Sequence, residues 1–133
     1  MAGPASQAAG AGIGATYSAR RTVEDKDTVG HLVPGMPMVA ATPFLVTVAE
    51  MACYEICKTL IEPARVTVGA RVEIDHLGAS KVGAVLVIDA ILRTREKNRF
   101  TFDVTIKDGE RTVATVRHVR AAVDAKRLMA ALG

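Results

Sequence analysis

One stretch of the chain, residues 44–60, is apolar on nearly every face of the helix that it predicts. Thr42 and Pro43 stand at its start, where Thr can cap and Pro suits the first turn. Pro63 follows it and ends the helix. A helix without a polar face must be buried on most sides. We therefore expect the rest of the chain to wrap around this one segment.

Extended segments flank this helix, most of them alternating apolar and polar residues as half-buried strands do. The predicted strands cover residues 17–23, 66–74, 83–93, 99–106 and 112–123, and a short closing helix is predicted over 125–132. Residues 107–110 contain Gly109 and predict a hairpin turn. Residues 28–37 contain Pro34, Gly35 and Pro37. They are predicted to lack regular structure and to form a lid or rim.

Long strands that follow one another through short turns form an antiparallel sheet. One buried helix wrapped by such a sheet predicts an α+β protein with the hotdog fold, an antiparallel β-sheet around a long central α-helix. Residues 16–133 are predicted to be one domain. Residues 1–15 are mostly Ala and Gly and predict a flexible N-terminal arm.

The composition argues against several other classes of protein. The net charge is only +3, and no basic run is interleaved with aromatics, so nucleic-acid binding is not expected. The N-terminus lacks the features of a signal peptide, and no apolar run reaches membrane-spanning length. We therefore expect a cytoplasmic protein that does not insert into membranes.

Two cysteines, Cys53 and Cys57, lie four residues apart in the predicted helix. This spacing is poor for a disulfide, and two ligands do not make a zinc site. We expect small buried thiols in a reducing compartment, with Cys53 near a substrate pocket as the alternative. No metal or other cofactor is predicted.

Three residues are candidates for chemistry. Glu50 lies in the middle of the apolar helix, where a buried carboxylate would have a raised pKa and suit a base or nucleophile; the alternatives are an outward position at a helix edge and a core salt bridge. His76 stands at a strand end and could transfer protons near neutral pH, or could be a surface residue. Thr42 lies two helical turns before Glu50 and could react or cap the helix. His31 and His118 have no helper that the sequence identifies.

Residues 41–53 carry a Thr and, eight positions later, a Glu within an apolar helix. This segment resembles the helix of the fluoroacetyl-CoA thioesterases and their hotdog relatives. Gly69 and His76 fall on a segment similar to the strand that bears that family's glycine and histidine, and Arg120 on one similar to the strand that bears its arginine. The resemblance implies hydrolysis of an acyl-CoA thioester by Thr42, Glu50 and His76, with Gly69 and Arg120 helping to hold the substrate.

One difference from that family concerns the acyl group. The family's fluoroacetyl enzyme has an aromatic lid before the helix, whereas residues 34–39 here contain no aromatic side chain. Another short or medium acyl group is therefore as well supported. Alternative functions are enoyl-CoA hydration, for which Asp75 and His76 are the only adjacent Asp–His pair, and acyl-CoA binding without catalysis.

A curved sheet leaves edge strands with unpaired backbone groups. Two chains that pair edge to edge would remove this liability and create a pocket between them. The sequence therefore predicts a homodimer with its active site near the interface.

Overall fold

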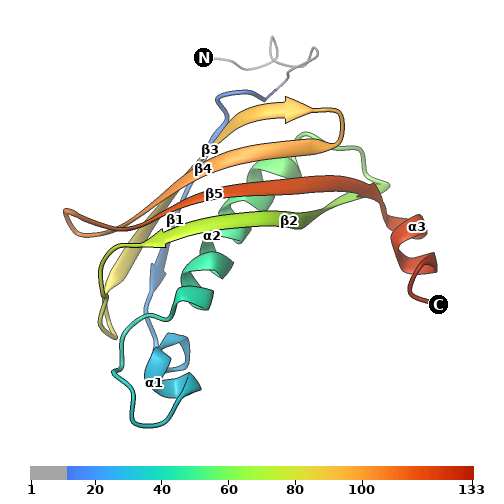
Figure 1. Ribbon diagram of the computed structural model, residues 1–133. Helices are drawn as coiled ribbons and strands as arrows, with labels where there is room; N and C mark the ends of the chain where they lie inside the picture. Colours follow the sequence, from blue (N-terminus) through green and yellow to red (C-terminus); the bar gives the residue numbers. More distant parts are fainter. Residues whose placement is uncertain (1–11) are drawn as a thin grey trace.

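The computed structural model describes residues 12–133, which form a five-stranded sheet curved around one helix (Figure 1). In chain order the elements are β1 (Thr16–Thr22), the 3-10 helix η2 (Asp25–Asp27), α1 (Val29–Leu32), α2 (Thr42–Cys57), β2 (Arg65–His76), β3 (Val85–Glu96), β4 (Arg99–Asp108), β5 (Arg111–Asp124) and α3 (Ala125–Ala130).

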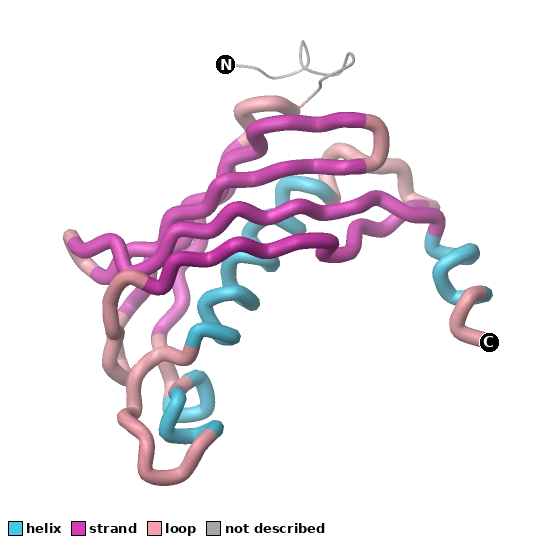
Figure 2. The backbone as a smooth tube through the Cα atoms, viewed as in Figure 1, coloured by secondary structure: helices cyan, strands magenta, loops and turns pink. Residues whose placement is uncertain are grey.

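The strands lie in the order β1-β3-β4-β5-β2, and every neighbouring pair is antiparallel. β1 and β2 are thus at opposite edges, and the chain between them crosses the concave face of the sheet as α2 (Figure 2). This arrangement confirms the predicted α+β hotdog fold. The predicted hairpin at Gly109 is also confirmed, because Gly109 has a φ of +62° between β4 and β5.

The core lies between α2 and the concave face of the sheet. Large side chains of β3 and β4 that face the helix, such as Leu86, Phe100 and Phe102, are at most 1% exposed. From α2, Leu45 and Ile56 pack into the same cluster. Each such side chain contributes about 1.5–3 kcal/mol by leaving water, so this layer fixes where α2 lies.

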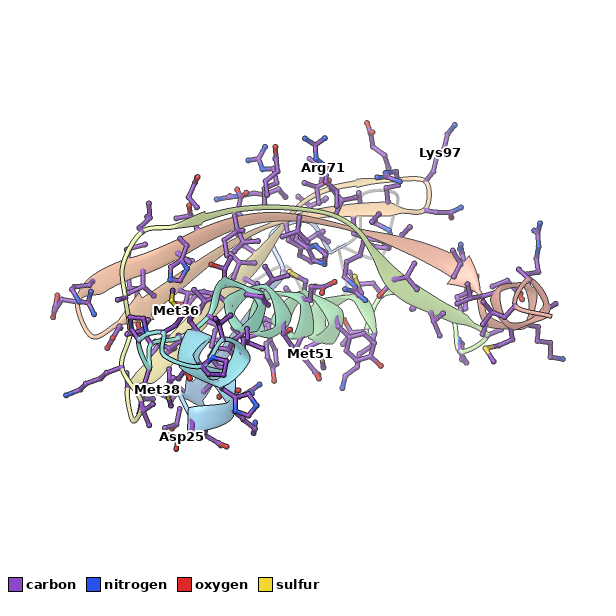
Figure 3. All side chains as sticks on the ribbon, turned by 60° about the horizontal axis from the view of Figure 1, so that its bottom comes forward. Asp25, Met36, Met38, Met51, Arg71 and Lys97 are labelled. Atoms are coloured by element: carbon purple, nitrogen blue, oxygen red, sulfur yellow. The ribbon has the colours of Figure 1, made fainter. Side chains whose placement is uncertain are left out.

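The expectation that the helix is buried on most sides is wrong for one of its faces. Thr47, Met51 and Tyr54 follow one another at helical spacing and are exposed, with Met51 50% exposed. Figure 3 shows Met51 on the side of α2 that faces away from the sheet. A single sheet covers only one side of a helix, so this face of α2 is left in solvent.

The expectation for residues 28–37 is wrong over their first part. Val29–Leu32 forms one helical turn, α1, which Thr28 caps by accepting a hydrogen bond from the His31 N–H at 3.1 Å. Pro34, Gly35 and Pro37 prevent regular secondary structure only from Pro34 onward. Leu32, Val33, Met36 and Met38 all expose much of their apolar surface beside the start of α2, which fits the predicted rim.

The predicted flexible arm, residues 1–15, lies mostly outside the described residues. Its last two residues pair with β3: the Gly14 N–H donates to the Leu92 carbonyl at 2.8 Å, and the Ala15 carbonyl accepts from the Leu92 N–H at 2.9 Å. The flexibility of the arm stays a prediction. From residue 12 onward, no helix has both the length and the hydropathy that crossing a bilayer would require.

Candidate active site

Thr42 and His76 form a side-chain pair at the start of α2. The Thr42 Oγ1 atom lies 2.8 Å from Nδ1 of His76, and both side chains are exposed. The alternative that Thr42 caps the helix is wrong, since Ala41 is the cap residue and no side chain bonds there. The hydroxyl is therefore available for the histidine.

The backbone before α2 explains why these two residues meet. The Ala40 N–H donates to the Ser80 carbonyl at 2.8 Å, and Val39 forms an isolated antiparallel bridge with Lys81. These contacts tie the segment that enters α2 to the loop that leaves β2. Since His76 is the last residue of β2, the hydroxyl and the imidazole meet at this junction.

Glu50 lies two turns further along α2 and faces β5. Its Oε2 atom is 3.5 Å from Nη1 of Arg120 and 3.6 Å from Nε2 of His118. The Glu50 side chain is 36% exposed. It is therefore accessible to a ligand, while Arg120 holds it on its buried side. Glu50 therefore does form an ion pair with buried Arg120, as the salt-bridge alternative predicted. Its carboxylate nevertheless stays accessible from solvent.

Arg120 is itself buried and fixed by strand β2. Its Nε donates to Oγ1 of Thr67 at 3.0 Å, and its Nη2 donates to the Thr67 carbonyl at 2.9 Å. These two hydrogen bonds leave Nη1 to face Glu50 and His118. A guanidinium held in this way is a fixed positive charge for the carboxylate.

His118 and Thr67 belong to this site, although sequence reasoning missed both. His118 and Arg120 are two residues apart on β5 and so point to the same side of the sheet, which is the signal that could have linked them. The ring is fully buried, and burial lowers the pKa of His118 below the ordinary histidine value. Thr67 carried no such signal, since only the pairing of β2 with β5 places it beside Arg120.

Gly69 leaves the space that the carboxylate occupies. A Cβ atom at this position would collide with Oε2 of Glu50 and would lie 3.3 Å from Cε1 of His118. The absence of a side chain, rather than an unusual backbone angle, is therefore what this position contributes.

A cavity of about 350 Å³ opens beside this group on the exposed face of α2. It is lined by Glu50, Met51, Tyr54, Thr67 and Arg120. Larger hollows lie elsewhere on the surface, for example over the outer face of the sheet beside Asp103 and Arg117, but those two residues are ion-paired with each other. The cavity at Glu50 is the one that reaches a carboxylate held in place by buried partners.

The two cysteines are free and buried, as predicted. Burial raises the pKa of the Cys57 thiol to about 11 and that of Cys53 further still. Neither thiol is an effective nucleophile at neutral pH, because the thiolate is the reactive form. Within residues 12–133, no three His, Cys, Asp or Glu side chains lie together as metal ligands would.

The chain therefore arranges the predicted residues in two groups. Thr42 contacts His76, whereas Glu50 contacts Arg120 and lies against Gly69. Thr42 and Glu50 are eight residues apart on one helix, which is about 12 Å of helical rise. A substrate would have to span this distance, or a second chain would have to bring the groups together.

A hotdog sheet with a held carboxylate beside a pocket on its helix is the arrangement expected of a hotdog thioesterase. The family model described as fluoroacetyl-CoA-specific thioesterase matches residues 23–126. The chain belongs to this family, which confirms the prediction of an acyl-CoA thioester hydrolase.

Relatives of known sequence or structure agree with this assignment. The fluoroacetyl-CoA thioesterase of Streptantibioticus cattleyicolor is 28% identical over 117 residues, covering 84% of each chain. A solved structure of a fluoroacetyl-CoA thioesterase has a TM-score of 0.85 at 27% identity, covering 90% of this chain and 93% of the other. A hot-dog-like protein from Thermanaerovibrio acidaminovorans has a TM-score of 0.84 at 21% identity, over 90% of this chain and 89% of that one, and shows the shared fold alone.

Gly69→Ala tests how closely the carboxylate is packed. The added methyl group must displace Glu50, so we expect a loss of about 1–3 kcal/mol of stability and a clear fall in turnover. In a Glu50→Ala background only the 3.3 Å contact with Cε1 of His118 remains, and the same change should cost much less. Thermal melting of the four proteins measures this coupling. An equal cost in both backgrounds would contradict the contact.

Proposed function

We propose that Glu50, Thr42 and His76 are the reacting groups of the thioester hydrolysis, in a site completed by two chains. The observation that carries the proposal is the Glu50 carboxylate, which faces an open cavity while Arg120, itself fixed by Thr67 and His118, holds it from the buried side. A carboxylate in this position is fixed in orientation before the substrate arrives, which is the main requirement for attack on an already reactive thioester.

The chemistry needs a nucleophile at the carbonyl carbon and a proton for the departing thiolate of CoA. Glu50 either attacks the carbonyl to form an anhydride that water then hydrolyses, or removes a proton from an attacking water. The Thr42–His76 pair would donate a hydrogen bond to the oxyanion and supply the proton. The start of α2 adds the favourable end of a helix dipole. Transfer of ¹⁸O from labelled water into Glu50 in a single turnover distinguishes attack from base catalysis.

The proposed roles of the binding residues follow from their contacts. Gly69 leaves room for the carboxylate. Arg120 lines the cavity, and most of its donors already bond to Thr67 and His118. Its contribution to holding the acyl-CoA therefore acts largely through Glu50.

We propose that the acyl-CoA substrate carries a short or medium acyl group without strict preference for fluoroacetate. The related enzyme has been solved, as a mutant, in complex with fluoroacetate and CoA, which supports a CoA ester as the ligand. In this chain the rim before α2 presents the flexible side chains Met36 and Met38 (Figure 3), which adapt to different shapes. We further propose a cytoplasmic location, where the free thiols of Cys53 and Cys57 would stay reduced.

A panel of acyl-CoA esters tests the substrate. Release of free CoA, followed with a thiol reagent, should be rapid for several acyl chain lengths. The values of kcat/KM for fluoroacetyl-CoA and acetyl-CoA should differ by less than about tenfold, since this chain has no aromatic lid to distinguish a fluorine atom from a hydrogen atom. A much larger preference for fluoroacetyl-CoA would contradict the proposed range, and no thiol release from any ester would contradict the activity.

Glu50→Gln tests the reacting group. The amide keeps the shape and can still accept from Arg120 but cannot attack or take a proton, so kcat should fall at least about a hundredfold. Stability should fall only by about 1 kcal/mol, because solvent screens the partly exposed pair. Glu73→Gln, which removes a carboxylate paired with Arg71 on the outer face, is the control and should leave turnover unchanged. Near-normal turnover of folded Glu50→Gln would contradict the mechanism.

The exposed apolar face of α2 and the open edge of β2 support the proposed homodimer. Val66 and Val68 on β2 and Met51 and Tyr54 on α2 all expose apolar surface, and β2 has a strand on one side only. A second copy that pairs along β2 and packs against α2 would cover Met51 and Tyr54 and could bring its Thr42–His76 pair towards Glu50.

Met51→Lys tests the dimer. A charge on the exposed face of α2 should weaken association and lower turnover together, because the site would lose its second chain. Turnover per molecule should recover in part as the protein concentration is raised, which separates this loss from a direct effect of Met51 on the cavity that it lines. Val85→Lys alters a similarly exposed apolar residue beside the opposite edge of the sheet and should change neither. Light scattering and turnover on the same samples measure both. A stable wild-type monomer with full activity would contradict the shared site.

A further inference from the structure

His118 is completely buried beside the proposed reacting carboxylate, and none of the catalytic roles above involves it. Its Nδ1 atom lies 2.8 Å from the backbone carbonyl oxygen of Arg71. A carbonyl oxygen only accepts hydrogen bonds, so Nδ1 carries a proton and donates it. Burial disfavours a second proton on the ring. Nε2 is then left with a lone pair that can accept.

The neighbours of Nε2 use this lone pair. Nη1 of Arg120 lies 3.1 Å from it, and a guanidinium only donates, so Nη1 donates to Nε2. Nη1 of Arg120 also lies 3.5 Å from Oε2 of Glu50. The Nε2 and Oε2 atoms are 3.6 Å apart, and both are acceptors. They share the guanidinium between them without a direct hydrogen bond.

We propose that His118 is a positioning residue for the hydrolysis: its neutral Nε2 accepts a hydrogen bond from Arg120 and so aims the guanidinium at Glu50. This inference rests on the proposed function, since it takes Glu50 as the reacting group. A proton on Nε2 would undo the arrangement. The ring would then point an N–H at the Arg120 donor and draw the carboxylate away from the guanidinium.

A bulge in β2 sets the tautomer of the ring. Gly69 pairs with Arg120 and Arg71 pairs with Val119, so Ala70 is an extra residue without a partner on β5. A bulge redirects local backbone groups, and here the Arg71 carbonyl meets the imidazole. The Arg71 side chain lies on the outer face of the sheet (Figure 3), bonded to Glu73 at 3.0 Å, so only its backbone takes part.

The other neighbours of the ring do not compete for Nε2. Across the sheet His118 pairs with Phe102 on β4 and Val72 on β2, neither of which titrates. The charged groups that face the ring are Glu50 from α2 and Arg120 from β5. The protonation of His118 is therefore linked to one carboxylate and one guanidinium, both in the proposed site.

Two amide variants separate the two ring nitrogens. In His118→Asn the amide can place an N–H where Nδ1 stood, but nothing reaches Arg120. In His118→Gln the longer side chain can place its oxygen near the position of Nε2. We expect kcat to fall at least about tenfold in His118→Asn, with KM within about threefold of wild type, and His118→Gln to keep most of the activity. Equal kcat in the two folded variants, or normal kcat in His118→Asn, would overturn the proposal.

A role only in packing would give a different pattern. Both variants would then melt at lower temperature while turnover per folded molecule stayed unchanged, which also overturns the proposal. Glu50→Gln measured alongside separates this inference from the proposed function. If Glu50→Gln is inactive and His118→Asn is normal, only the role of His118 fails; if Glu50→Gln is active, the mechanism fails as well.

A measurement on the unaltered protein does not depend on whether the variants fold. The chain has three histidines, so their ¹⁵N side-chain signals can be assigned by comparing the spectrum with those of single substitutions at His31 and His76. We expect His118 to be neutral at pH 7, with the proton on Nδ1, and to resist protonation as the pH is lowered, because burial lowers its pKa below the ordinary histidine value. A proton on Nε2 at neutral pH would overturn the proposal.

Discussion

The contact between Arg120 and Glu50 is the interaction on which the site depends. A buried guanidinium is costly unless its donors are satisfied and its charge is balanced. Thr67 and His118 satisfy donors, and Glu50 supplies the negative charge. The same contact serves function, because it holds a partly exposed carboxylate beside a cavity. The residues that stabilise Arg120 are thus the residues that orient the proposed reacting group.

The backbone of β2 makes this arrangement possible. Gly69 lacks the side chain that would fill the place of the carboxylate, and the bulge after it brings the Arg71 carbonyl to His118. Both features lie within three residues of one strand. The pairing of β2 with β5 and the geometry of the site are therefore set together, and a change in the register of β2 would disturb both.

The exposed face of α2 connects the fold to assembly. One curved sheet covers the inner side of the helix and leaves Met51 and Tyr54 in solvent, next to the cavity. The Thr42–His76 pair lies about 12 Å of helical rise away from Glu50. A second copy that covers this face would both bury apolar surface and bring reacting groups together, so a single physical requirement supports the proposed dimer and the proposed shared site.

The sequence by itself determined the periodicities: one apolar helix, alternating strands and the turn at Gly109, and hence an antiparallel sheet around a helix. It also offered Thr42, Glu50 and His76 as candidates, and the spacing that they share with the thioesterase family gave them a joint role. It could not determine which residues meet. His118 and Thr67 come from strands that are paired only in the folded sheet, and the bulge at Ala70 is defined only by the register of β2 against β5. Tertiary structure alone decided that Thr42 bonds to His76 while Glu50 is held by Arg120, because such contacts depend on strand order and register, which no local pattern encodes.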